Sequence, residues 1–218
     1  MSDSPVVAII DYGMGNLFSV QRACSHVGLH AEITSDPDFA AGADALILPG
    51  VGAFGDAMKA LDALDMSAAI RQAASSGKHV LGICLGLQLL MERSCEFGDF
   101  AGLGLIPGDV VAFDHPREGE RELKVPQVGW NRVWRAREDA WDDTLLSEAH
   151  NGVHQYFVHS FYVRPADEGN VAARTTYGDV EFCSAARSEN VFACQFHPER
   201  SGPQGIRMYE RFAAMVRG

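Results

Sequence analysis

Short, uninterrupted apolar runs alternate with stretches of helical apolar spacing through the first half of the chain. The runs lie at residues 6–10, 45–48 and 79–83, with a weaker one at 31–34. An unbroken apolar run fits a strand that is buried on both faces of a parallel sheet. Helical patterns lie between or after the runs, at residues 17–27, 56–64, 67–76 and 85–93. Repeated β–α units of this kind predict an α/β fold, a doubly wound, mostly parallel sheet with helices on both faces.

The second half of the chain has a different pattern, in which strand-like segments follow one another closely. These segments are residues 103–113, 125–134, 156–163, 171–177, 180–186 and 191–196. Several alternate apolar with polar residues, so we expect an antiparallel β extension of the parallel core. A final helix would place Tyr209, Phe212 and Val216 on one face. The chain has no repeat, low-complexity segment or linker, so we expect a single domain over residues 1–218.

The composition argues against several classes of protein. The net charge of −11 and the lack of any basic run disfavour nucleic acid or an anionic membrane as a partner. The five cysteines include no C-x-x-C pair, which indicates free thiols in a reducing compartment and no common zinc spacing. The longest apolar stretch, residues 80–91, is too short to span a bilayer, and residues 1–5 carry no signal-peptide pattern. We therefore expect a cytoplasmic protein.

Three glycine-rich turns each follow a predicted strand. They are residues 12–16, 49–55 and 82–86. Turns after the strands of a doubly wound sheet lie at its carboxyl edge, where ligands bind. Glycines at these turns let backbone amides approach a ligand closely. A phosphate-binding loop is the alternative for residues 49–55, but that turn lacks the G-K-[ST] ending.

Cys84 lies at the centre of the third turn, in the pattern G-x-C-x-G between a strand and a helix. This pattern has the form of a nucleophile elbow, whose flanking glycines relieve crowding in a tight turn. The following helix would favour the thiolate, the reactive form of the side chain. A buried structural cysteine is the alternative, and we prefer that interpretation for Cys24, Cys183 and Cys194. Cys95 has no comparable context and is left unassigned.

A thiolate nucleophile needs an imidazole to move protons, and the imidazole needs an orienting group. His197 ends an apolar strand and is followed by Pro198 and Glu199. In an extended segment, positions i and i+2 project to the same side, so the Glu199 carboxylate can reach the imidazole. A surface turn with a capping carboxylate is the alternative for this H-P-E sequence, and the elbow weighs against it. An attacked carbonyl also needs two N–H donors, which we expect from Leu85 and from the Gly50–Gly52 turn.

Several motifs together resemble class I glutamine amidotransferases. The elbow G-I-C-L-G-L-Q and the late H-P-E are typical of that family. One branch is matched more closely, the glutaminase subunit of imidazole glycerol phosphate synthase. Four further segments carry that likeness, D-Y-G-M-G-N, P-G-V-G-A-F-G, K-V-P-Q-V-G-W-N and Y-F-V-H-S. The resemblance covers nearly the whole chain, although Phe18, Gln127 and Phe161 depart from residues common in the branch.

The resemblance implies a role for each matching position. It makes Cys84 the nucleophile, His197 the general acid and base, and Glu199 the partner of His197. The remaining implied assignments are the oxyanion hole at Val51, Gly52 and Leu85, glutamine binding at Gln88, Glu96, His159 and Ser160, and the partner interface at Asn16, Trp130 and Asn131. The family uses no metal or organic cofactor on this chain.

The resemblance also implies the reaction and the partner. Glutamine would be hydrolysed to glutamate through a Cys84 thioester, and the ammonia would pass to a cyclase subunit. That subunit makes imidazole glycerol phosphate and AICAR in histidine biosynthesis, so the two chains would form a heterodimer. Two alternatives remain, the same glutaminase feeding a different synthase, and a catalytically inactive binding subunit.

Overall fold

The computed structural model describes residues 5–218. Most of the N-terminal segment on which the expectation of no signal peptide rests, residues 1–4, lies outside this range. Within the described residues, no helix is both long enough and apolar enough to cross a membrane.

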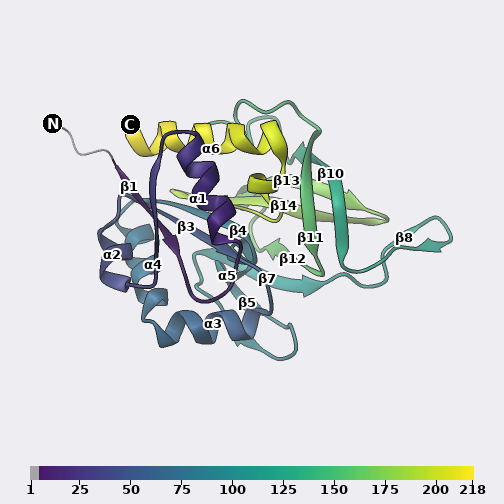
Figure 1. Ribbon diagram of the computed structural model, residues 1–218. Helices are drawn as coiled ribbons and strands as arrows, with labels where there is room; N and C mark the ends of the chain where they lie inside the picture. Colours follow the sequence, from purple (N-terminus) through teal and green to yellow (C-terminus); the bar gives the residue numbers. More distant parts are fainter. Residues whose placement is uncertain (1–4) are drawn as a thin grey trace.

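One large sheet runs through the whole molecule, and its first five strands are parallel (Figure 1). In spatial order these strands are β2 (His30–Thr34), β1 (Val6–Ile10), β3 (Ala45–Gly50), β4 (His79–Cys84) and β15 (Val191–Cys194). The first four come from the predicted β–α units. The fifth comes from the far end of the sequence and pairs parallel with β4. The parallel core predicted from the apolar runs is therefore confirmed, with one added strand from the second half.

Alternate residues of the inner parallel strands β1, β3, β4 and β15 face two different hydrophobic cores. Val7 and Ile9 of β1 pack in the core under α1 (Leu17–His26) and α6 (Gly202–Arg217). Ala8 and Ile10 face the opposite core. That core is covered by α2 (Pro37–Gly42), α3 (Phe54–Ala63), α4 (Met66–Ser75) and α5 (Leu85–Leu89). Both faces of these strands are buried, which is why their sequences are largely unbroken apolar runs.

The second half of the chain forms the predicted antiparallel extension (Figure 1). Beyond β15 the sheet continues with β14 (Val180–Ser188), β12 (Phe161–Pro165), β7 (Ile106–Ala112), β5 (Met91–Ser94) and β6 (Phe100–Ala101). These neighbours pair antiparallel except β5 and β7, which pair parallel. A branch is formed by β10 (Gln127–Arg135), β11 (Val153–His159) and β13 (Val171–Tyr177). The hairpin β8 (Arg117–Glu118) and β9 (Arg121–Glu122) and the short helices η1 (Glu168–Asn170) and η2 (Pro198–Arg200) complete the described chain.

Two predicted elements were wrong. The helix expected over residues 85–93 is only α5, and the chain then becomes strand β5, which pairs with β6 and β7. Leu87, Leu89 and Leu90 are all fully buried, so the apolar residues here mark no single helical face. The strand expected over residues 156–163 is two strands that separate at Ser160. The first pairs with β10 and the second with β7 and β14, so the chain changes partner between them.

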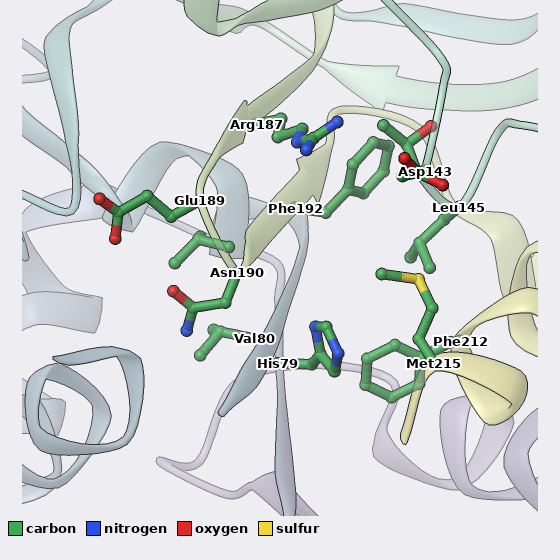
Figure 2. Close-up of a pocket in the computed structure, with 12 residues that line it drawn as sticks. His79, Val80, Asp143, Leu145, Arg187, Glu189, Asn190, Phe192, Phe212 and Met215 are labelled. Atoms are coloured by element: carbon green, nitrogen blue, oxygen red, sulfur yellow. The ribbon is translucent and has the colours of Figure 1, made fainter. Parts of the chain in front are cut away.

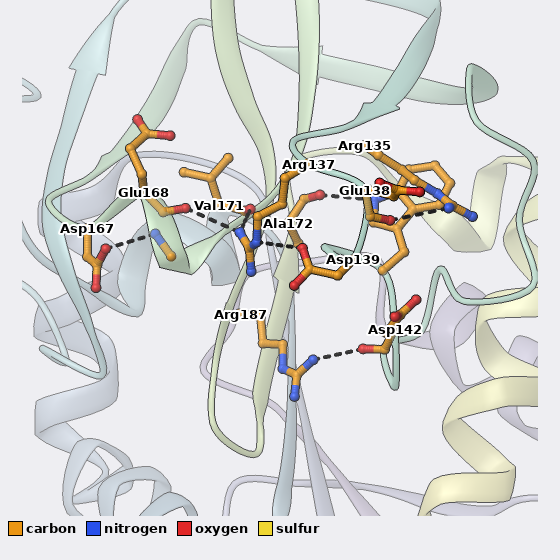
Figure 3. A network of polar contacts seen from close by, with 12 residues as sticks. Arg135, Arg137, Glu138, Asp139, Asp142, Asp167, Glu168, Val171, Ala172 and Arg187 are labelled. Carbon is orange, nitrogen blue, oxygen red and sulfur yellow. Dashed lines mark hydrogen bonds and ion pairs between the residues drawn. The ribbon is translucent and has the colours of Figure 1, made fainter.

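A polar network holds the long connection between β10 and β11 against the sheet (Figure 3). Arg137 donates to the carbonyl oxygen of Val171 at 3.1 Å and pairs with Asp139 at 3.0 Å. Arg187 donates to the carbonyl oxygen of Asp142 at 2.8 Å. The wholly buried Trp141 donates from its ring to Ala172 O at 3.0 Å. These bonds tie the irregular connection to the neighbouring strands β13 and β14.

Candidate active site

Three neighbouring parallel strands bring the predicted site residues to one edge of the sheet. In the register of β3 and β4, Gly50 lies opposite Cys84. In the register of β4 and β15, Cys194 lies opposite Ile83, so the residues that follow Cys194 continue past the same edge. The carboxyl ends of parallel strands meet at a common edge, and ligand sites form there. The site therefore depends on β15, which crosses from the end of the sequence to pair beside β4.

Cys84 sits at a sharp turn between β4 and α5. Its backbone has φ 56° and ψ −106°, a conformation that residues other than glycine rarely adopt. A side chain at Gly86 would overlap the carbonyl oxygen of Leu48, and one at Gly82 would lie 2.9 Å from Ala193 Cβ. The two glycines therefore let the turn pack against β3 and β15, as the elbow pattern predicted. The helix after it is five residues long, so its dipole supports a thiolate less than the predicted longer helix would.

His197 and Glu199 are buried together after β15. The Nδ1 atom of His197 lies 2.8 Å from Glu199 Oε1, as the i and i+2 spacing predicted. The backbone N–H of His197 donates to Tyr156 O at 2.8 Å, which fixes the chain to β11. Because Nδ1 is engaged, Nε2 is the nitrogen that remains for proton transfer. Nε2 is buried and has no hydrogen-bond partner among residues 5–218.

The surroundings of His197 favour its charged form. Burial lowers the pKa of His197, but the neighbouring Cys84 and Glu199 outweigh burial and raise it to about 10. The Nε2 atom of His197 has no hydrogen-bond partner within residues 5–218. We therefore attribute the effect of Cys84 on the pKa of His197 to the Coulombic interaction between the two side chains. An ionised thiol and an imidazolium next to each other stabilise one another. The arrangement is thus suited to a thiolate–imidazolium pair oriented by a carboxylate.

A cavity of about 330 Å³ opens beside Cys84. Eight of the residues proposed from the sequence line it: Val51, Gly52, Cys84, Leu85, Gln88, Glu96, His159 and Ser160. The lining also includes Phe97, Pro126 and Val158, which the sequence did not single out, and Phe161, noted above only as a departure from the branch. The cavity therefore combines a nucleophile with polar groups and apolar walls, the usual composition of a small-molecule site.

Gln88 and Gln195 form a buried pair of amides beside Cys84. Gln88 Nε2 donates to Phe161 O at 3.0 Å and to Gln195 Oε1 at 3.2 Å. This leaves Gln88 Oε1 as the atom available to a ligand. Gln195 Nε2 in turn donates to Cys84 Sγ at 3.7 Å. Gln195 was not predicted as a site residue, because its only signal in the sequence is a single amide within the apolar segment 191–196.

Glu96 and His159 are also held in place by backbone groups. Glu96 Oε2 accepts a hydrogen bond from the N–H of Phe54, the first residue of α3, at 2.6 Å. His159 Nδ1 lies 2.8 Å from Phe161 O, and its ring packs against Phe113 and Phe182. Burial, and to a lesser degree the charge of His197, lowers the pKa of His159 to about 4, against a smaller opposing effect of its bond to Phe161. The imidazole of His159 is therefore neutral at physiological pH.

The turn after β3 lies open at the mouth of the cavity. Val51 is 45% exposed, and Gly52 has φ +115°, which favours glycine. The buried Tyr12 hydroxyl donates to the carbonyl oxygen of Pro49 at 2.9 Å, so the loop after β1 supports this turn from behind. Tyr12 was not among the residues proposed from the sequence. A side chain at Gly50 would overlap the Tyr12 hydroxyl, which explains the glycine there.

The three predicted interface residues differ in their surroundings. Trp130 is 56% exposed, and its ring packs edge-on against Tyr156, whose carbonyl holds His197. Asn16 is exposed at the start of α1. The side chain of Asn131 instead serves the protein itself, because it donates to Thr176 O at 2.8 Å and accepts from Arg132 N at 2.7 Å.

A second pocket lies at the opposite edge of the sheet (Figure 2). Its volume is only about 20 Å³, and its lining includes His79 and Val191, the first residues of β4 and β15, together with Phe212 of α6. The elbow and the H-P-E segment are at the other ends of these strands. In residues 5–218, no three His, Cys, Asp or Glu side chains are grouped in a way that could hold a metal ion.

Comparison with known proteins agrees with the motifs and the fold. The family model for glutamine amidotransferase class-I matches residues 8–216. The imidazole glycerol phosphate synthase subunit HisH of Rhodopirellula baltica is 50% identical over 208 residues, 95% of this chain and 97% of that protein. The chain belongs to the class I glutamine amidotransferase family, in its HisH branch. The HisH subunit of Geobacter sulfurreducens is 45% identical over 96% of this chain and 98% of its own length.

Solved structures show that the class I amidotransferase fold extends well beyond close relatives. A glutamine amidotransferase crystal structure has a TM-score of 0.72 at 20% identity, over 97% of this chain and 98% of the other. The structure of PurLQS from Thermotoga maritima has the same TM-score and identity, over 98% of this chain and 99% of the other. At this identity the likeness establishes the fold, and the predicted fold class is confirmed.

Proposed function

We propose that the chain hydrolyses glutamine through a covalent thioester on Cys84. The Cys84 thiolate attacks the side-chain amide carbon, and the C–N bond breaks as His197 protonates the departing ammonia. Water then attacks the thioester, giving one proton to His197 and the other to solvent; the C–S bond breaks, and glutamate and the Cys84 thiolate result. The observation that carries this proposal is the position of Cys84, on a strained elbow beside the buried His197–Glu199 pair and open to a cavity.

The negative oxygen that develops on the attacked carbonyl needs preplaced donors. We assign this role to backbone N–H groups at Leu85 and in the turn of Val51 and Gly52. All three residues line the cavity with Cys84. Gly50 lies opposite Cys84 across the sheet, which places the turn that follows it beside the elbow. Loss of one such donor typically costs about 10²–10³ in rate.

Four polar residues would hold the substrate's amino-acid end. We propose that Gln88 Oε1 and the Glu96 carboxylate receive the α-amino group of glutamine, and that His159 and Ser160 complete the pocket. Gln88 and Glu96 fit this role because each is fixed by a backbone bond, to Phe161 O and Phe54 N. A fixed acceptor binds a cation with little loss of side-chain freedom.

The ammonia would pass to a cyclase subunit that makes imidazole glycerol phosphate and AICAR, in a heterodimer. The HisH relatives are named as subunits of a synthase, which supports a partner chain. We propose that the partner docks beside the cavity over Asn16, Trp130 and Asn131. Trp130 supports this assignment, since exposed aromatic residues are enriched at interfaces.

The single sheet that joins both halves of the chain supports one domain over residues 1–218.

Replacing Cys84 tests whether this chain only releases ammonia while the partner carries out the synthesis. In a complex with the cyclase, Cys84→Ala should lose glutamine-dependent synthesis by a factor on the order of 10⁶. Synthesis from added ammonium salts should stay nearly intact, because this chain supplies only ammonia. Cys95→Ala, which removes an exposed thiol, is the matched control and should change neither rate. Failure of ammonium to restore the product would show that this chain does more than release ammonia.

A further inference from the structure

Gln195 lies between the nucleophile and a residue of the substrate pocket. It is fully buried, with no exposed side-chain surface. Its Nε2 donates to Cys84 Sγ at 3.7 Å, and its Oε1 accepts from Gln88 Nε2 at 3.2 Å. The two ends of one amide therefore join Cys84 to Gln88.

The backbone explains why an amide reaches this place. Val191 and Ala193 of β15 pack in the core that α5 covers, and Phe192 and Cys194 pack in the opposite core. By strand alternation Gln195 faces the side of α5, where Gln88 lies. Its backbone N–H continues the pairing with β14, donating to Ser184 O at 2.9 Å. A buried amide costs free energy unless both its ends are bonded, and here Cys84 and Gln88 supply the partners.

We propose that Gln195 is a positioning residue that donates a hydrogen bond to the Cys84 thiolate. The bond holds the sulfur in place and stabilises its ionised form. A charged sulfur accepts a hydrogen bond more strongly than a thioester sulfur, so the bond is strongest before attack and weakens as the C–S bond forms. The inference rests on the proposed function only in taking Cys84 as the nucleophile.

Several titratable groups face Cys84, and Gln195 is a neutral group among them. They are His197 and Glu199 after β15, Tyr12 after β1, Cys194 in β15, Glu96 after β5 and His159 in β11. Substituting Gln195 by an apolar residue changes none of these charges. A shift in the titration of Cys84 would therefore report the loss of the donated hydrogen bond.

The pH dependence of Cys84 alkylation by iodoacetamide tests the proposal. The parent is the full chain with Cys95→Ser, because Cys95 is the exposed thiol; the other four cysteines, Cys84 included, are buried, so alkylation is read at Cys84 by peptide mapping. In this parent, Gln195→Leu should raise the pH midpoint of Cys84 alkylation and slow the reaction at neutral pH by about 3- to 10-fold. The plateau rate at high pH should not fall, because a more basic thiolate is the stronger nucleophile.

Two further variants separate a donated bond from a packing effect. Gln155→Leu makes the same change at another fully buried glutamine, which has no side-chain partner within residues 5–218, and should leave the midpoint in place. Gln195→Met removes the donor at nearly constant volume and should shift the midpoint as Gln195→Leu does, even if the leucine variant folds poorly.

An unchanged midpoint in both Gln195 variants, with Cys84 still alkylated, would overturn the proposal. A fall in the plateau at an unchanged midpoint would do the same, since it would indicate a structural role only. Failure of Cys84 to react at any pH in the parent would instead overturn the proposed nucleophile itself, and this inference with it.

Discussion

Two buried histidines near Cys84 are driven to opposite charge states by their neighbours. His197 lies between a thiol and the Glu199 carboxylate, which together raise its pKa to about 10 against the opposing effect of burial. His159 lies among aromatic rings, and burial, with a smaller contribution from the charge of His197, lowers its pKa to about 4. At the scale of the residue, then, the local partners decide which imidazole can carry a proton.

The environment of His159 predicts a loss of stability in acid. Its folded-state pKa lies below the unfolded value of 6.5, so the folded protein binds fewer protons than the unfolded chain in this range. The stability that the neutral ring contributes is present above pH 6.5 and is lost as the pH falls toward about 4. The loss should amount to about 3 kcal/mol. Urea unfolding at several pH values should show it in the natural protein and not in His159→Phe. A constant stability difference between the two across this range would contradict the prediction.

Substitution of Glu199 should be milder than substitution of His197. Glu199 orients the imidazole through a bond of 2.8 Å at Nδ1 but does not itself transfer the proton. Measured in complex with the cyclase, Glu199→Gln should reduce the glutaminase kcat by about 10⁴ and His197→Ala by on the order of 10⁶. Circular dichroism would confirm that both variants fold. Equal losses would mean that the two residues act as one inseparable unit.

At the scale of the element, the elbow depends on close packing of α5 against β3. A methyl group at Gly86 would overlap Leu48 O, a backbone atom that cannot move without disturbing β3. Gly86→Ala should destabilise the fold by about 1–3 kcal/mol or more and abolish glutaminase activity. Gly42→Ala is the control, because a methyl group there meets nothing within 4 Å and the residue ends helix α2. Thermal unfolding of both variants checks this. An unchanged melting temperature for Gly86→Ala would contradict the packing argument.

Elements with a local signal were predicted well, and elements defined by distant contacts were not. The parallel strands follow from their apolar runs, and the bond between His197 and Glu199 follows from their spacing in an extended segment. The prediction of one helix over residues 85–93 was wrong because Leu87, Leu89 and Leu90 are all buried, so the apolar positions do not mark one helical face. Only its pairing with β6 and β7 makes its second half a strand.

The candidate site shows the same limit. Its main residues could be proposed because they lie in recognisable turns and motifs. Gln195 and Tyr12 could not, because their importance comes from partners far away in sequence, Cys84 and Pro49. The break at Ser160 was also hidden, since strand-like residues stand on both sides of it while the pairing changes from β10 to β7.

At the scale of the whole molecule, the two edges of the parallel sheet, at the amino and carboxyl ends of its strands, differ in what they carry. The carboxyl edge carries the elbow and the cavity, and exposed apolar side chains of Val51 and Phe97 stand at its mouth. The exposed Trp130 packs on Tyr156, whose carbonyl oxygen accepts a hydrogen bond from the backbone N–H of His197. A partner that covers this edge would exclude water from the site and receive ammonia as it forms. The proposed interface and the proposed chemistry therefore share one end of the molecule.

Direct detection of the covalent intermediate tests the central claim. The full chain, bound to the proposed cyclase partner, would be mixed with glutamine, quenched in acid within the first turnovers and examined by mass spectrometry. We expect an adduct with the mass of glutamine less ammonia, located by peptide mapping on Cys84 and absent from Cys84→Ala. Formation of glutamate with the adduct on another residue, or with no adduct even under conditions that slow hydrolysis, would contradict the account.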